Sequence, residues 1–196
     1  THSPRLRRLI RQTSGEVTKD VDLVIVGEDD EMDRSVLDRV LPALEHMLRN
    51  SVDHGLETKA ERKKTDKPKT GTILIDLKRE GSEIVIRISD DGKGINLEAI
   101  REKARERGLM KEDSDLTDKE VLRFILESGF STASKVTQLS GRGVGMDVVN
   151  SEVKQLGSSL QIDTIEGKGT KFTVRLPLTL SVNKALLVHV GEDIYA

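Results

Sequence analysis

Apolar residues recur along this chain with two different periods, and each period predicts a different kind of element. Between residues 33 and 54 they fall three or four positions apart, as on one face of a helix. Pro42 lies inside this run and lacks a backbone donor, but the apolar face keeps its phase across it. We therefore predict one kinked helix rather than two. We predict further helices over residues 4–18, 96–107, 117–127 and 145–156.

Strict alternation of apolar and polar residues predicts two β-hairpins. The first turns at residues 80–82 and the second at residues 166–169, and the β-rich run 21–26 predicts one more strand. Each hairpin has one apolar and one mixed face, which is typical of a sheet covered by helices on one side. The predicted fold is a two-layer α/β sandwich. The helices expected on the covered face are 33–54, 96–107 and 145–156.

Two segments lack an apolar period. Residues 55–71 are rich in charge, and we predict an exposed loop there. Residues 129–145 are dominated by Ser, Thr, Gln and Gly, and we predict a mobile loop whose length itself indicates a function. A new apolar run follows Pro177. We therefore expect a first domain over residues 1–177 and the truncated start of a coupling or regulatory domain over 178–196.

The composition narrows the class of protein. Of the 196 residues, 35% are hydrophobic and 34% are charged, which suits a buried core under a densely charged surface. The net charge is −2 and the aromatic residues are three Phe and one Tyr, so neither charge nor stacking favours nucleic acid or anionic lipid. The absence of Cys excludes disulfides and thiolate metal sites. Without a signal-peptide pattern or an apolar run near the roughly 20 residues of a membrane span, a cytoplasmic domain is expected.

Three polar residues form a stripe beside the apolar face of the predicted helix 33–54. His46, Asn50 and His54 recur every four residues, so they share one side of the helix. The amide oxygen of Asn50 suits Mg²⁺, which prefers oxygen ligands and is usually shared with substrate phosphates. The alternatives are an ordinary polar ridge and a zinc site, although a central Asn argues against zinc.

An acidic turn ends the strand predicted over residues 84–89. In the run from Asp90 to Gly94, a sheltered carboxylate could accept a hydrogen bond from an adenine amino group. The glycines would let the backbone approach the ring closely. Taken alone, Asp-Gly after a strand more often marks an ordinary turn.

A glycine loop, Gly141–Gly145, precedes the helix predicted to begin near Met146. Successive backbone N–H groups at a helix N-terminus bind phosphate. The spacing G-x-G-x-G differs from the dinucleotide-binding pattern, and no Walker lysine follows the last glycine. Each motif is weak alone, so the argument depends on their order and spacing.

Together these motifs resemble the ATP-binding catalytic domain of CheA-type chemotaxis histidine kinases, within the GHKL superfamily of gyrase, Hsp90, histidine kinases and MutL. The stretch from His46 to Gly55 resembles the family's N-box, and Asp90 to Gly94 resembles its first glycine box. Residues 129–132 resemble its phenylalanine-box segment, and 140–149 its second glycine box. The resemblance covers nearly the whole chain. It implies a Bergerat-type ATP-binding fold with a mixed, mostly antiparallel sheet and helices on one face.

The resemblance also implies roles for individual residues. Asp90 would bind the adenine amino group, supported through water by Thr170, and Asn50 would ligate Mg²⁺ between the phosphates of ATP. His54 would contact phosphate, and residues 129–141 would form a closing lid. The other residues implied in nucleotide binding are His46, Asp53, Gly92, Gly94, Ser131, Thr132, Ser140, Gly141, Arg142, Gly143, Val144, Gly145 and Met146.

His46 stands where gyrase-like, Hsp90-like and MutL-like ATPases have a Glu that activates water. The resemblance therefore implies transfer of the γ-phosphate of ATP rather than plain hydrolysis, with His46 and Asn50 as the catalytic residues. The acceptor would be a histidine on a separate phosphotransfer domain. A response regulator would act downstream, and a coupling protein and receptor would bind through a regulatory domain.

Two alternatives stay open. One is a nucleotide-binding regulatory module without transfer activity, although every pocket position that can be matched is filled. The other is a GHKL ATPase of the DNA-handling or chaperone kind, against which His46 in place of Glu argues. Transfer to a supplied acceptor domain, or vigorous hydrolysis without one, would separate the three functions.

Overall fold

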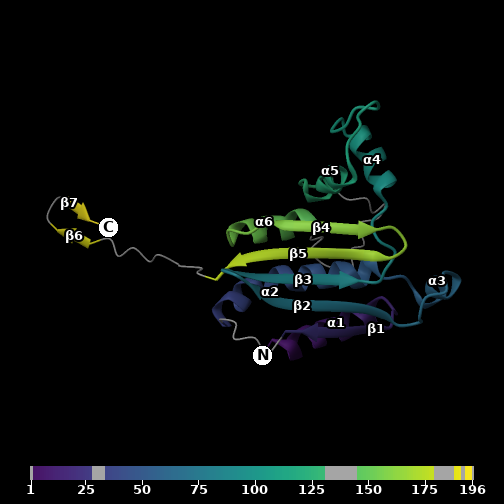
Figure 1. The fold of residues 1–196 in the computed structure, drawn as a ribbon, viewed down its shortest axis with the longest axis horizontal. Coiled ribbons are helices and arrows are strands. Elements are labelled where there is room, and N and C mark those ends of the chain that lie inside the picture. The colour runs from purple at the N-terminus through teal and green to yellow at the C-terminus, as the bar shows by residue number, and fades with distance from the viewer. Residues whose placement is uncertain (1, 28–33, 131–144, 179–187, 191–192, 196) are drawn as a thin grey trace.

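The main sheet has five strands in the order β1-β2-β3-β5-β4 (Figure 1). The computed structural model describes residues 2–27, 34–130, 145–178, 188–190 and 193–195. β1 pairs in parallel with β2, and the other pairs are antiparallel, which confirms the predicted mixed, mostly antiparallel sheet and both hairpins. The strands are β1 (Val21–Val26), β2 (Gly71–Glu80), β3 (Glu83–Asp90), β4 (Leu160–Ile165) and β5 (Gly169–Pro177).

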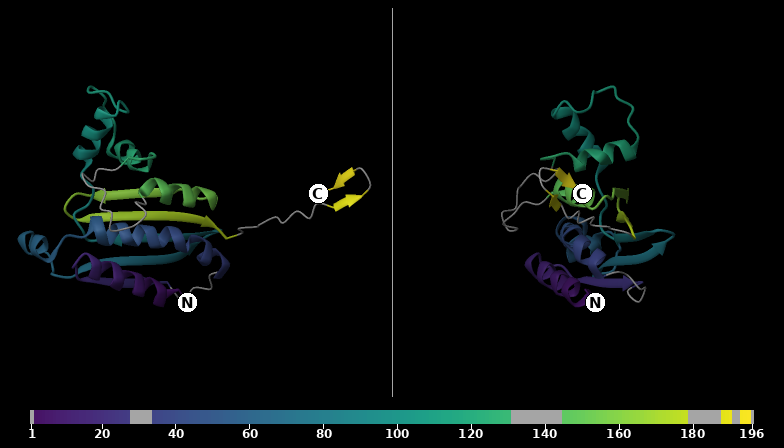
Figure 2. Two further views of the ribbon diagram at one scale, coloured as in Figure 1. Left: turned by 180° about the vertical axis from the view of Figure 1, so that it is seen from behind. Right: turned by 90° about the vertical axis from the view of Figure 1, so that its left-hand side faces the viewer.

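Three helices cover one face of this sheet (Figure 2). They are α1 (Ser3–Glu16), α2 (Arg34–Asn50) and α6 (Met146–Gln155). α2 runs as one helix through Pro42, which confirms one helix rather than two, and it continues into a π-helical turn, η1 (Ser51–Gly55). The predicted kink at Pro42 stays a prediction. The π turn was not predicted, and it changes the spacing of side chains at the end of the polar stripe.

The core lies between the helices and the sheet. The strand register places Ile75 opposite Ile88, and Ile88 opposite Phe172, so the apolar residues of three strands form rows on one face. The helix α2 contributes Val40, Met47 and other side chains that are at most 4% exposed. Each large apolar side chain buried in this way stabilises the fold by about 1.5–3 kcal/mol.

The predicted helix 96–107 forms, but its predicted place over the sheet is wrong. α4 (Leu97–Glu106) lies beyond the β4 edge, beside α5 (Asp118–Leu122) and the 3-10 turn η2 (Arg123–Leu126) (Figure 1). The amphipathic pattern specifies that Ile100 and Ala104 are buried, but it does not specify against which element. α5 begins at the predicted capping box, in which Thr117 and Glu120 satisfy each other's backbone N–H groups.

The prediction of an exposed loop over residues 55–71 is partly wrong. It contains a short helix, α3 (Lys59–Lys64), which begins at a capping box of Thr58 and Glu61. This segment also holds Arg62, whose side chain is 1% exposed. A Thr three residues before a Glu was the available sequence signal, but the density of charge obscured it.

The expected second domain, residues 178–196, lies largely outside the described residues. Two short strands there, β6 (Val188–Val190) and β7 (Asp193–Tyr195), pair antiparallel in a separate sheet. The domain boundary at residue 177 therefore stays a prediction. Among the helices described, none has both the length and the apolar character needed to span a membrane.

Candidate functional site: a buried carboxylate between glycines

A buried carboxylate marks the end of β3. Asp90 is 9% exposed, and its Oδ1 accepts hydrogen bonds from the N–H of Gly92 at 3.0 Å and of Thr170 at 3.3 Å. Burial raises the pKa of the Asp90 carboxyl, while these two donors and the Ser51 hydroxyl act in the opposite direction. Both backbone hydrogen bonds end on Oδ1, so Oδ2 retains acceptor capacity for a ligand.

Glycines surround this carboxylate because the backbone approaches too closely for side chains. A Cβ placed on Gly92 would lie 2.1 Å from the carbonyl oxygen of Gly55. One placed on Gly169, whose φ is +133°, would lie 1.9 Å from the carbonyl oxygen of Asp90. A Cβ on Gly55 would come within 3.1 Å of Asp90 Oδ2. Three distant segments of the chain thus meet around one acceptor, and a flat ligand can approach it.

The hydroxyl of Thr170 lies on the β5 side of Asp90. It is 3.2 Å from the hydroxyl of Thr164 on β4, which also accepts a hydrogen bond from the N–H of Ile95 at 2.9 Å. Thr170 is 7% exposed. The hairpin β4–β5 therefore fixes the hydroxyl of Thr170, and the backbone N–H of the same residue donates to the carboxylate.

The polar stripe on α2 faces α6. Nδ1 of His46 lies 3.2 Å from Oε2 of Glu152, and Nδ2 of Asn50 lies 3.2 Å from the sulfur of Met146. Met146 is the first residue of α6, so Asn50 lies against the end of the glycine loop. Of the predicted stripe, His46 and Asn50 thus lie against α6, whereas the predicted binding roles of these residues stay predictions.

His54 departs from the predicted stripe. It lies in η1 rather than in an α-helical turn, and its side chain is 57% exposed, with Nε2 3.4 Å from Oδ2 of Asp53. The π turn is held from outside by Lys19, whose ammonium donates to the carbonyl oxygens of Val52 at 2.9 Å and Asp53 at 2.6 Å. Burial lowers the pKa of Lys19, and the nearby Asp53 charge opposes this effect.

The glycine loop is described only at its end. Gly145 precedes α6, and Asp147 in the first turn of that helix accepts a hydrogen bond from the N–H of Gly129 at 3.4 Å. The remaining predicted residues of the lid and loop lie outside the described residues. They are Ser131, Thr132, Ser140, Gly141, Arg142, Gly143 and Val144.

A charged network that the sequence did not predict supports the turn after Asp90. The guanidinium of Arg62 donates to Oδ2 of Asp91 at 2.9 Å and to Oε1 of Glu57 at 3.1 Å. Lys67 donates to Oε2 of Glu57 at 2.7 Å and to the carbonyl oxygen of Gly92 at 2.8 Å. The segment predicted as an exposed loop thus holds the backbone of the turn in place.

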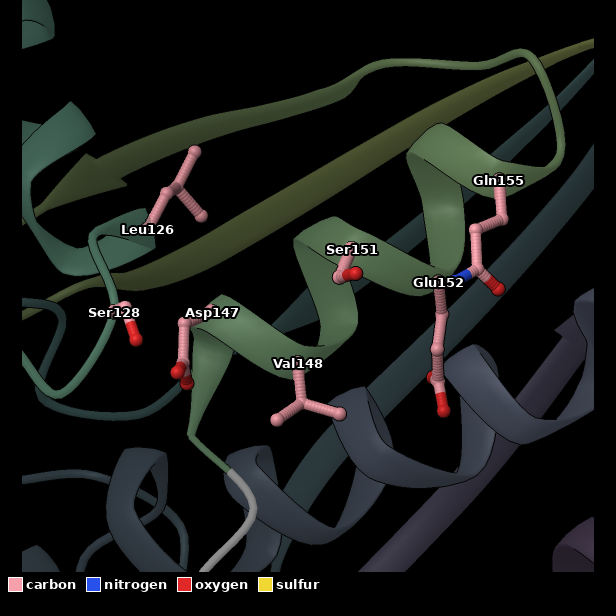
Figure 3. Close-up of a pocket in the computed structure, with 7 residues that line it drawn as sticks. All are labelled: Leu126, Ser128, Asp147, Val148, Ser151, Glu152 and Gln155. Atoms are coloured by element: carbon pink, nitrogen blue, oxygen red, sulfur yellow. The ribbon is translucent and has the colours of Figure 1, made fainter.

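A groove lies between η2 and α6, close to the polar stripe. Figure 3 shows the residues that line it, on α6, at the end of η2 and in the segment that follows η2. One of them is Glu152, which contacts His46. The lining residues are Leu126, Ser128, Asp147, Val148, Ser151, Glu152 and Gln155.

Comparison with known proteins identifies the family to which this chain belongs. Residues 38–180 match the family described as Histidine kinase-, DNA gyrase B-, and HSP90-like ATPase, and the chain belongs to this family. The solved structure of the blue-light activated histidine kinase of Erythrobacter litoralis EL346 aligns with 89% of this chain and 41% of that chain. Its TM-score is 0.50 at 16% identity, which shows a shared fold.

Curated relatives confirm the resemblance to CheA-type kinases within that family. The chain is 42% identical to Chemotaxis protein CheA of Treponema pallidum, over 98% of this chain and 24% of the relative. It is 44% identical to Sensor histidine kinase CheAY of Helicobacter pylori, over 96% and 24%. It is 46% identical to Chemotaxis protein CheA of Borreliella burgdorferi, over 97% and 22%. The chain therefore spans about a quarter of the length of these relatives.

Proposed function

We propose that this chain is the ATP-binding catalytic domain of a CheA-like histidine kinase. It would transfer the γ-phosphate of ATP to a histidine on a separate phosphotransfer domain. The observation that carries the proposal is the buried Asp90 carboxylate, which has an available acceptor oxygen among glycines. The names of the curated relatives support the same function.

The Asp90 end of the site suits an adenine ring. An ionised carboxylate in a sheltered pocket accepts a charge-assisted hydrogen bond from an exocyclic amino group. The close backbone at Gly92 leaves room for a flat ring where a side chain would otherwise lie. Thr170 places a hydroxyl beside the carboxylate, where it would support the adenine through a water molecule.

The α2 and α6 end suits the phosphates. We propose that Asn50 supplies its amide oxygen to Mg²⁺, which neutralises the charge that develops on the phosphates during transfer. His54 and Asp53 lie in the following turn, where we place contacts to phosphate or its ion. The N–H groups at Gly145 and Met146, at the start of α6, would bind phosphate oxygens.

His46 favours transfer over hydrolysis. A Glu at this position would activate a water molecule, whereas an imidazole, whose ordinary pKa lies near neutrality, can assist the geometry or the proton transfer of an acceptor. Phosphoryl transfer depends mainly on positioning and charge neutralisation, so the domain needs no covalent intermediate of its own. We propose His46 and Asn50 as the catalytic residues.

The partners follow from the same proposal. In a two-component pathway the phosphotransfer domain would receive the phosphoryl group, and a response regulator would receive it next. A coupling protein and a receptor would act through regulatory parts of a longer protein. We propose that the domain works in the cytoplasm, where ATP is supplied.

Calorimetric titration tests the proposal first. ADP and a non-hydrolysable ATP analogue should bind one to one, and Asp90→Asn should weaken binding at least about a hundredfold, since a charge-assisted bond is replaced by an amide. Asp22→Asn, on the edge strand β1, is the matched control and should bind normally. Undiminished binding by Asp90→Asn would contradict the adenine site.

A transfer assay then separates the activities. Wild type mixed with labelled ATP and a purified phosphotransfer domain should label the acceptor histidine. Binding without transfer would indicate a regulatory module, and vigorous hydrolysis without an acceptor would indicate an ATPase.

A further inference from the structure

One contact between α2 and α6 has a chemical consequence for the proposed reaction. Nδ1 of His46 and Oε2 of Glu152 are 3.2 Å apart, and the two side chains are 28% and 30% exposed. Figure 3 shows the Glu152 side chain extending from α6 toward the neighbouring helix α2. The pair therefore lies at the edge of the proposed phosphate site, within reach of solvent and of an incoming molecule.

The contact determines which ring nitrogen carries a proton. An ionised carboxylate can only accept hydrogen bonds, so Nδ1 of His46 must be the donor to Glu152. In the neutral imidazole this places the lone pair on Nε2. A carboxylate on one nitrogen of a histidine fixes both the tautomer and the ring orientation.

A second contact also holds α2 against α6. Asn50, one turn after His46, contacts Met146 on α6. Both stripe residues are thus held by the same neighbouring helix, at positions 146 and 152 of the chain. Rotation of His46 away from α6 would lose its bond to Glu152 without any effect on the Asn50 contact.

We propose that Glu152 is a positioning residue for phosphoryl transfer: it holds the His46 imidazole with Nδ1 protonated and leaves Nε2 to the reacting groups. The inference rests on the proposed function, because Glu152 would act only through His46, and the catalytic role of His46 is part of that function. Glu152 itself would touch neither ATP nor the acceptor. A pair this exposed contributes little to stability, so its removal should leave the fold intact.

The test is a double-mutant cycle on the transfer rate at saturating ATP. Glu152→Ala should lower the rate about tenfold, the lower end of the effect of losing a carboxylate that orients a functional histidine. Glu152→Gln keeps an oxygen that accepts from Nδ1 and should stay within about threefold of wild type. In the His46→Ala background, Glu152→Ala should cause no further loss. Gln155→Ala, one turn further along the exposed side of α6, is the control and should match wild type.

Two additional measurements separate positioning from a general structural effect. The dissociation constant of the ATP analogue should be the same in wild type, Glu152→Ala, Glu152→Gln and Gln155→Ala, because the effect of Glu152 is on the rate and not on nucleotide binding. Nitrogen NMR of His46 should show a protonated Nδ1 in wild type and Glu152→Gln, and a proton shifted to Nε2 in Glu152→Ala.

Several results would overturn the inference. They are a Glu152→Ala rate equal to that of the Gln155→Ala control, an additive loss in the His46→Ala background, or an unchanged tautomer. If wild type transfers no phosphoryl group, the proposed function fails instead, and the NMR tautomer still decides whether Glu152 positions His46.

Discussion

The backbone N–H of Thr170 donates a hydrogen bond to Oδ1 of Asp90 across 3.3 Å. This bond joins the start of β5 to the end of β3, and it holds one carboxylate oxygen so that the other remains available. Burial disfavours the charged form of Asp90 and raises its pKa, whereas this hydrogen bond favours the charged form. This conflict between stability and ligand binding leads to the first prediction.

Asp90→Asn should stabilise the protein without nucleotide at neutral pH, although it weakens nucleotide binding. The pKa of Asp90 is raised above its ordinary 3.8 in the folded state, so the ionised carboxylate costs stability once the pH exceeds the folded pKa. Below 3.8 the group is protonated in both states, and this cost disappears. The gain from Asn should therefore shrink as the pH falls from 7 toward 4. Urea unfolding of both proteins across this range measures it, and a gain independent of pH would contradict the raised pKa.

Arg62→Met should destabilise the fold by about 3 kcal/mol, because it leaves the Glu57 carboxylate buried without its guanidinium partner. Denaturant unfolding gives this value directly. Lys63→Met changes the adjacent exposed residue and should stay within about 0.5 kcal/mol of wild type. Equal stabilities for the two variants would show that the network makes no net contribution.

Gly169→Ala should cost about 2–3 kcal/mol and abolish nucleotide binding, because the new methyl group would meet the Asp90 carbonyl oxygen. Gly167→Ala is the matched control in the same hairpin. Gly167 has a φ of +80° and open space around it, so its substitution should cost only about 1 kcal/mol of backbone strain. Thermal unfolding and calorimetry of both variants separate the steric effect from the strain.

Asn50→Ala should weaken binding of the ATP analogue about tenfold when Mg²⁺ is present, the equivalent of losing about 1.5 kcal/mol. Binding of ADP without Mg²⁺ should be unchanged, because the adenine end is intact. Gln161→Ala, on the exposed side of β4, controls for a general effect of removing an amide. An equal loss with and without Mg²⁺ would contradict the metal role of Asn50.

Elements with a regular apolar period were predicted well from the sequence. The helix through Pro42 and the two hairpins form as expected, because burial of one face determines each of them locally. The location of α4 was wrong because an apolar stripe does not specify the surface that covers it. The π turn at Ser51–Gly55 was missed because it has no simple pattern of apolar residues.

The sequence predicted the proposed ligand-binding residues of the site but not the charged residues that support them. Asp90, Asn50 and Thr170 were singled out with their roles implied by family resemblance, and the structure brings Asp90 next to Thr170. The supporting residues Arg62 and Lys67 were missed because buried and solvated charges look alike in a sequence. Only the fold shows that these charges converge on the backbone of one turn.

The Asp90–Thr170 bond also determines when the surroundings of Asp90 can be completed during protein synthesis. Chain emerging from the ribosome would deliver α1, α2 and the first hairpin long before β5. Until Gly169 and Thr170 arrive, the carboxylate lacks one of its donors and one wall of its surroundings. If Asp90 binds adenine as we propose, ATP should therefore bind only after β5 has been synthesised. Nucleotide binding would then stabilise only a nearly complete domain. A chain whose synthesis stops before β5 should not bind nucleotide.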